Sequence, residues 1–138
     1  MSKTYSVIFW VICDGISTAL ANTSFQPYRV ADLQIDGKRM TGFAMDVAEF
    51  KDGMKFSDVE VKLVEFLQVH NSDIEKLRVL NHPPLMHFDV GCFIDNTIHS
   101  YSLRISNKLV GLLAFNSVEF EISYYRKNEN HINQQTLE

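Results

Sequence analysis

The side chains best suited to chemistry lie on two stretches with strict two-residue alternation, residues 86–94 and 118–125. Because side chains alternate across a strand, each stretch has one apolar face and one face of mixed character. The two mixed faces together carry these residues: His87, Asp89, Phe93, Glu119, Glu121 and Tyr125. Carboxylates beside exposed aromatic rings are typical of a protein interface, where the rings anchor a partner and the charges steer its approach.

If the two stretches form neighbouring strands, their mixed faces combine into one binding surface. We therefore predict that five residues contact a partner protein: Asp89, Phe93, Glu119, Glu121 and Tyr125. Trp10, on a third apolar stretch, is a candidate for the same surface. The alternative is that the carboxylates pair across the sheet with Arg104 or Lys127 and have no binding role.

Catalytic and metal-binding signatures are missing from the sequence. It contains no HExxH, paired CxxC, GxSxG, P-loop or GxGxxG pattern. His87 and Asp89 lie on the same side of one stretch, and His99 can join them as a third group. An enzyme of unrecognised type that uses these three residues is therefore kept as an alternative, but the main prediction is a protein with no catalytic residues, no metal and no cofactor.

The composition is that of an ordinary globular protein with a mild acidic excess. A chain of 138 residues predicts one domain whose core needs no disulfides. The net charge of -4, with scattered basic residues, argues against nucleic-acid binding and favours a partner with a basic surface. The apolar run 7–13 is too short to span a bilayer and predicts a buried strand. Cys13 and Cys92 lie in apolar runs and are predicted to be buried thiols, which suits the cytoplasm.

The order of elements predicts an α+β fold. Strands are expected at 5–13, 28–36, 38–50, 86–94 and 117–125, with a further strand or extended arm at 98–105. Asp36-Gly37 supplies the positive φ angles of a tight hairpin turn. Three helices are expected, opened by the capping boxes Ser57-x-x-Glu60 and Ser72-x-x-Glu75 and by Ser106.

These elements predict an antiparallel or mixed sheet of about five to six strands, with helices mainly on one face. A ferredoxin-like arrangement fits this order. We expect residues 1–125 to form a single α+β domain and residues 126–138 to form a polar C-terminal tail. The strand order does not follow from the sequence.

Residues 88–125 resemble the end of a family of small, mostly bacterial domains of unknown function. The family pattern is a strand with Asp-Phe-Gly, a capped leucine-rich helix, and a strand ending in Ser-x-Tyr. Asp89-Val90-Gly91 corresponds to the first element, with Val90 in place of the phenylalanine. Ser106-Asn107-Lys108-Leu109 opens the helix, and Ser123-Tyr124-Tyr125 ends the last strand.

Some members of that family are similar to immunity proteins encoded next to toxins. The resemblance therefore implies a cytoplasmic binding protein that neutralises a cognate toxin domain, often a basic nuclease. We adopt this as the predicted function, with no nucleic acid or membrane as partner. The alternatives are a small-ligand sensor or accessory domain, with a pocket lined by Trp10, Phe9 or Tyr101, and a structural or oligomerisation role.

Overall fold

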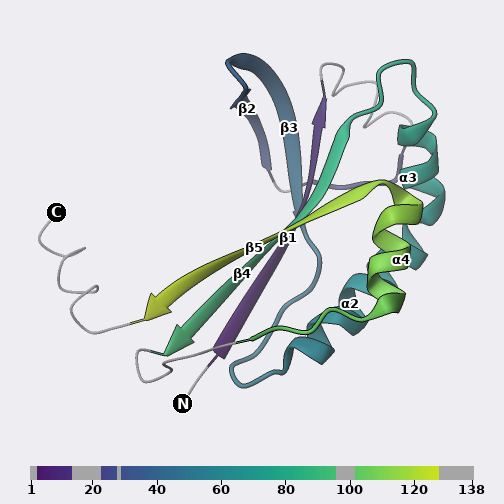
Figure 1. Ribbon diagram of the computed structural model, residues 1–138. Helices are drawn as coiled ribbons and strands as arrows, with labels where there is room; N and C mark the ends of the chain where they lie inside the picture. Colours follow the sequence, from purple (N-terminus) through teal and green to yellow (C-terminus); the bar gives the residue numbers. More distant parts are fainter. Residues whose placement is uncertain (1–2, 14–22, 28, 96–101, 128–138) are drawn as a thin grey trace, which may run out of the picture.

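The computed structural model describes residues 3–13, 23–27, 29–95 and 102–127 (Figure 1). The strands in these ranges are β1 (Lys3–Cys13), β2 (Arg29–Ile35), β3 (Lys38–Asp46), β4 (Leu85–Asp95) and β5 (Val118–Lys127). The helices are α2 (Phe56–Val69), α3 (Asn71–Arg78) and α4 (Asn107–Asn116). The predicted α+β class is confirmed.

The strands form one mixed sheet in the order β2-β3-β1-β4-β5. All neighbouring pairs are antiparallel except β4 and β5, which are parallel. The central strand is β1. Its residues Val7, Phe9 and Val11 are buried on one face of the sheet, whereas Ile8 and Trp10 on the other face are half-buried. In the described part of the chain between β4 and β5, α4 is the helix of the crossover connection that a parallel pair needs.

The β2–β3 hairpin turns where the sequence predicts it. Asp36 has a φ of 50° and Gly37 a φ of 76°, and a tight hairpin turn needs these positive values. The turn sets the register, so that Ile35 lies opposite Lys38 and Val30 opposite Phe43. Phe43 thereby enters the core, where it is fully buried.

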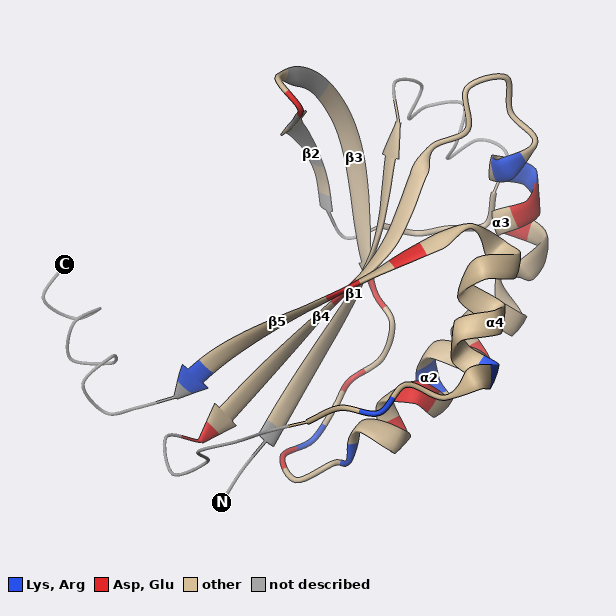
Figure 2. Ribbon diagram, viewed as in Figure 1, with Lys and Arg blue, Asp and Glu red and all other residues tan. Residues whose placement is uncertain are grey.

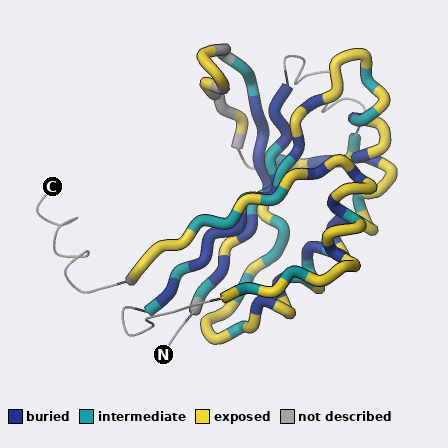
Figure 3. The backbone as a smooth tube through the Cα atoms, viewed as in Figure 1, coloured by how far each residue is buried: buried dark blue, intermediate teal, exposed yellow. Residues whose placement is uncertain are grey.

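Helices α2, α3 and α4 all lie against the same face of the sheet (Figure 1). The apolar stripe of α2 has the i, i+4, i+7, i+8 spacing of a buried helix face, and all four residues are buried: Val59, Leu63, Phe66 and Leu67. The Phe66 ring centroid lies 4.9 Å from that of Phe9 and 5.7 Å from that of Phe88. These rings join α2 to the two central strands, in the layer where buried residues are concentrated (Figure 3).

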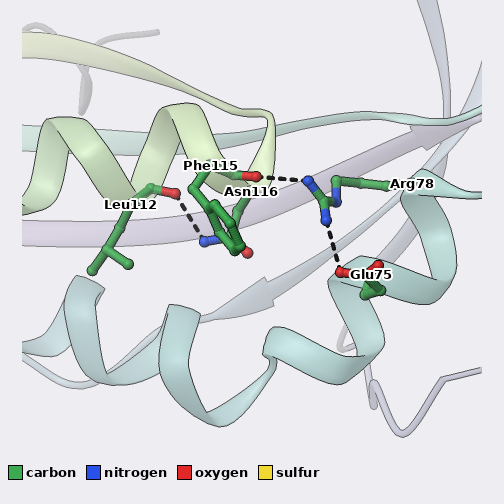
Figure 4. Close-up of polar contacts among 5 residues, drawn as sticks. All are labelled: Glu75, Arg78, Leu112, Phe115 and Asn116. Atoms are coloured by element: carbon green, nitrogen blue, oxygen red, sulfur yellow. Dashed lines mark hydrogen bonds and ion pairs between the residues drawn. The ribbon is translucent and has the colours of Figure 1, made fainter.

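Two polar contacts fasten the helix layer. Ser24 donates to Asp73 through its backbone N–H, at 3.1 Å, and through its hydroxyl, at 2.5 Å. Arg78 on α3 donates to the Phe115 carbonyl at the end of α4, at 2.6 Å, and to Glu75, at 2.7 Å (Figure 4). A cation at a helix C-terminus is favoured by the helix dipole, so Arg78 stabilises α4 as well as the α3–α4 contact.

The predicted starts of the first two helices are each two residues too late, because the N-caps are Lys55 and His70 and not Ser57 and Ser72. Phe56, not Ser57, begins α2, because the buried Phe56 packs on Tyr5 and Asp58 accepts a hydrogen bond from the Lys55 N–H at 3.0 Å. His70 ends α2 and directly precedes α3, which leaves no capping position for Ser72. The third start is confirmed, since the Ser106 hydroxyl accepts from the Leu109 N–H at 3.2 Å.

The remaining fold predictions divide into tested and untested parts. Residues 102–106 form no strand, so the described part of the predicted arm at 98–105 does not join the sheet. A ferredoxin-like unit has a helix after its first strand, and residues 14–22 lie outside the described ranges, so that arrangement stays a prediction. Strand β5 continues to Lys127, two residues past the predicted end of the domain. None of the helices in the described part is long and apolar enough to cross a membrane.

Both cysteines are buried, as predicted. Cys92 lies opposite Tyr5 on β1, whereas Cys13 ends the same strand. Tyr5 and Cys13 are eight positions apart, which corresponds to roughly 26 Å of strand and is far beyond the reach of a disulfide.

Candidate partner-binding face

The face of the sheet opposite the three helices carries the alternate residues of β1, β4 and β5 that point away from the core. We call it the open face, in the sense that none of the described helices lies against it (Figure 1). Its members on β4 and β5 are the predicted site residues, because their neighbours Met86, Phe88 and Val90 are buried under the helices.

The register of β4 and β5 brings the predicted site residues together. Asp89 lies opposite Glu121, and Phe93 lies opposite Tyr125. Glu119 lies opposite His87, one rung from the Asp89–Glu121 pair on the same face. The expectation that the two mixed strand faces combine into one surface is therefore confirmed, whereas the binding role of the five residues stays a prediction.

Strand β1 extends this surface on its other side. Trp10 lies opposite His87, and Ile8 lies opposite Asp89. Both side chains are half-buried, although the corresponding side chains on the helix-covered face are fully buried. The sequence predicted a buried strand here but not its neighbours, so only the pairing shows that Trp10 and Ile8 flank the carboxylates.

The aromatic end of the open face is a stacked pair. The Phe93 and Tyr125 ring centroids are 4.9 Å apart and the ring planes differ by 20°. A Cβ atom at Gly91 would stand 3.4 Å from the Phe93 ring and 3.7 Å from the Tyr125 ring. The rings thus lean over the glycine, as aromatic side chains do when they cover a glycine in a sheet. Tyr125 nevertheless keeps half of its surface exposed.

Three carboxylates of the open face, those of Asp89, Glu119 and Glu121, lack a cationic partner among the described residues. Asp89, Glu119 and Glu121 make no salt bridge or hydrogen bond with any described residue. Burial, together with the repulsion from Glu121, raises the pKa of Asp89 above its usual range, against a smaller opposing effect of His87. Strands β1, β4 and β5 carry Lys or Arg only at their ends, so the centre of the sheet is acidic (Figure 2).

Arg104 and Lys127 were the alternative partners, which would give these carboxylates a purely structural role. Arg104 lies in the segment that precedes α4 and lines a pocket at the start of α2, on the helix side. It is therefore not a cross-strand partner of the acidic residues. Lys127 lies opposite Asp95 in the register, at the far end of β5 from Glu119 and Glu121.

The described geometry gives little support to the alternative that the chain is an enzyme. His87 and Asp89 share the open face, but His99 lies outside the described residues. No group of three His, Cys, Asp or Glu side chains within the described ranges is arranged to hold a metal ion. Nothing in the described geometry therefore adds to the generic spacing seen in the sequence.

The pocket at the start of α2 has a volume of about 320 Å³. Its polar lining includes Lys55, Glu60, Arg104 and Ser106, and Glu60 accepts from the Ser106 N–H at 2.8 Å. This is not the lining that the sequence suggested, because Phe9 is fully buried in the core, Trp10 lies on the open face, and Tyr101 lies outside the described residues. Sequence periodicity gives no signal for it, since it forms between segments 46 residues apart.

No protein-family model matches this sequence, and no curated protein or solved structure is significantly similar to it. The resemblance of residues 88–125 to small bacterial domains therefore stays a prediction. Arguments about function depend on the geometry of the open face and on the chemistry of its residues.

Proposed function

We propose that this chain is a non-catalytic binding protein whose open face docks a basic protein partner. In its most concrete form, it is an immunity protein that binds and neutralises a cognate toxin domain in the cytoplasm. The contact residues are Asp89, Phe93, Glu119, Glu121 and Tyr125, with Trp10 and Ile8 beside them.

One observation carries this proposal: Asp89, Glu119 and Glu121 lack cationic partners among the described residues. Asp89 and Glu121 lie directly opposite each other, and like charges in such positions destabilise a sheet. A partner that places Lys or Arg side chains over this pair would relieve the repulsion and make charge-assisted hydrogen bonds. Carboxylates retained without a local counter-ion are therefore better explained by binding than by folding.

The aromatic residues supply most of the binding affinity, which the charged groups do not. Charged groups at a rim mainly accelerate association, whereas large rings that become desolvated supply most of the affinity. Tyr125 is half exposed and its ring is already held by stacking on Phe93, so little side-chain freedom would be lost on binding. The open face thus combines steering charges with a pre-arranged aromatic anchor.

The first experiment is capture of the partner from the native cell with tagged protein, with attention to the product of the neighbouring upstream gene. A stoichiometric complex with a basic, toxin-like domain is expected. Recovery of the tagged chain alone, while the neighbouring product is demonstrably present, would contradict the immunity function.

The second experiment tests the surface itself. Glu119→Lys combined with Glu121→Lys is expected to weaken the captured complex by at least about tenfold, because two favourable charge contacts become repulsive. Glu65→Lys, which reverses an exposed charge on the outer side of α2, is the matched control and is expected to leave the affinity unchanged. Equal affinities for the two variants would exclude the open face as the docking surface.

A second candidate function is binding of a small anionic ligand in the pocket at the start of α2. Its volume falls at the lower end of the range for ligand sites, and Lys55 and Arg104 both line it. Calorimetric titration of the purified protein with inorganic phosphate tests this candidate, and Arg104→Ala should abolish any heat of binding. An absence of heat with phosphate and with small carboxylates would remove it.

A further inference from the structure

The pocket at the start of α2 brings charges of both signs together without pairing them. Lys55 directly precedes α2, Glu60 lies in the second turn of this helix, and Arg104 comes from the segment before α4. Figure 2 shows basic and acidic residues beside one another where that segment crosses the start of α2. No salt bridge in the described part of the chain joins Glu60 to either cation. The pocket therefore offers one anionic and two cationic groups to a molecule that enters it.

The Glu60 carboxylate is held in place, but half of it is unused. Its Oε2 accepts the Ser106 N–H at 2.8 Å, which joins α2 to the N-cap residue of α4. Its Oε1 has no hydrogen-bond partner among the described residues. An ionised carboxylate only accepts hydrogen bonds, whereas an ammonium group only donates them and carries the opposite charge. A ligand with an ammonium group therefore complements Glu60, and a purely anionic ligand would meet it as a like charge.

The two cations complement the opposite end of such a ligand. The Lys55 and Arg104 side chains form no salt bridge with any described residue. A guanidinium group binds a carboxylate through two parallel N–H groups, and a lysine ammonium adds a point charge beside it. A molecule that carries a carboxylate next to an ammonium group can thus use all three charged side chains of the pocket.

The size and the apolar lining of the pocket restrict the rest of the ligand. A volume of about 320 Å³ lies at the lower end of the range for ligand sites, which suits a small metabolite. Phe56 is buried in the same lining, and Leu103 is half-buried against the core. Apolar walls of this kind favour an apolar group on the ligand, because its contact with them removes apolar surface from water.

We propose that the pocket at the start of α2 binds a free α-amino acid with an apolar side chain. The ammonium group of the ligand donates to Glu60, and its carboxylate lies between Lys55 and Arg104. Its side chain packs on Phe56 and Leu103. This inference rests on the second candidate function, because it requires that the pocket takes a small ligand, and it names that ligand as a zwitterion. It is independent of docking at the open face, which lies on the other side of the sheet (Figure 1).

Calorimetric titration of the full chain tests the ligand class. Leucine, methionine and phenylalanine are the whole ligands, and at least one of them is expected to give a heat of binding. The amino acid that binds most tightly is then compared with its two halves, which for leucine are isocaproate, without the ammonium group, and isoamylamine, without the carboxylate. Each half is expected to bind at least about tenfold more weakly, because it loses one set of charge contacts.

Two variants assign the two ends of the ligand. Glu60→Gln keeps an oxygen that accepts the Ser106 N–H but removes the charge, so it is expected to weaken the amino acid at least about tenfold and to leave the half without the ammonium group unweakened. Arg104→Gln is expected to weaken both. Glu65→Gln, an exposed position of α2 outside the pocket, is the matched control and should change neither. Circular dichroism establishes that each variant is folded.

Three outcomes would overturn the proposal: no heat with any of the three amino acids, a half ligand that binds as tightly as the whole, or a Glu60→Gln variant that binds the amino acid as tightly as the unmodified chain. Heat with phosphate or isocaproate alone would keep the second candidate function and remove this inference. An absence of heat with every probe would remove both. Capture of a toxin domain is measured separately and is unaffected by any of these results.

Discussion

On the helix-covered side of the sheet, the carboxylate of Asp73 accepts two hydrogen bonds from Ser24, whereas on the open face the carboxylate of Asp89 faces that of Glu121. Burial alone raises the pKa of Asp73, but the hydrogen bonds from Ser24 and the nearby His70 outweigh it and lower the pKa below its usual value. The pKa of Asp89 is raised instead. The same residue type is satisfied where the fold is held together and left unsatisfied where a partner can supply the missing charge.

The first test of this comparison removes one aromatic ring from the helix-covered side of the sheet and one from the open face. Phe88→Ala takes a fully buried ring from the core beside Phe9 and Phe66, and is expected to lower the free energy of unfolding by about 3–5 kcal/mol. Phe93→Ala takes a half-buried ring from the open face and should cost about 1 kcal/mol. Urea denaturation measures both, and similar losses would mean that the open face contributes to stability as a second core.

The second test removes the anchored carboxylate. Asp73→Asn is expected to lower the free energy of unfolding by about 1–3 kcal/mol at neutral pH, because the Ser24 donors lose a charged acceptor. Since the folded pKa of Asp73 is lowered, its stabilising effect is present above the unfolded value of 3.8 and is lost as the pH falls through the folded pKa. The difference in the free energy of unfolding between the variant and the unmodified chain should therefore shrink as the pH falls below 3.8. A constant difference across the acidic range would contradict this origin.

The third test concerns Gly91, where the open face has no room for a side chain. A Cβ atom there would lie 2.7 Å from the Ser6 hydroxyl oxygen, so Gly91→Ala is expected to cost about 1 kcal/mol or more. Ser6→Ala removes that oxygen and should recover most of the loss in the double variant. Additive effects in this double-mutant cycle would show that the two residues do not interact.

The smallest expected effect is a gain in the free energy of unfolding, whereas the preceding variants are expected to lose stability. Because the folded pKa of Asp89 is raised, its ionised form costs stability, and the cost develops as the pH rises from the unfolded value of 3.8 through the folded pKa. Asp89→Asn is therefore expected to stabilise the isolated protein slightly at neutral pH, by about 0.5 kcal/mol or less, and to have no stabilising effect in acid. Thermal unfolding at several pH values measures this. Destabilisation at neutral pH would show that Asp89 has a structural role.

The sequence predicted those features that depend on local spacing. Two-residue alternation identified the strand at 86–94 and the set of residues on its mixed face, and Asp36-Gly37 identified the hairpin turn. Local rules failed where a distant contact competes with them, as when burial of Phe56 against Tyr5 moves the start of α2 ahead of Ser57. The pairing of Asp89 with Glu121 depends on register across strands, which no local pattern contains.

Two further features could not be predicted from local patterns: the parallel pairing of β5 with β4, and the function that the resemblance implies. That β4 and β5 lie side by side in parallel follows from packing of α4 over the sheet, which the helix sequence does not specify. The position of Trp10 beside the acidic residues likewise depends on the pairing of β1 with β4, which no local pattern contains. The toxin partner remains a prediction, because neither periodicity nor geometry identifies a particular protein.

The central position of β1 also determines how the protein can fold while it is being made. Ile8 pairs with Asp89, 81 residues further along the chain, so β1 leaves the ribosome long before one of its two neighbours. The 49 residues from the end of β3 to the end of β4 take roughly 2–10 s to synthesise. Throughout that interval the apolar side chains of Phe9 and Val11 lack the strand that completes their burial, which makes β1 the segment that chaperones are expected to bind first.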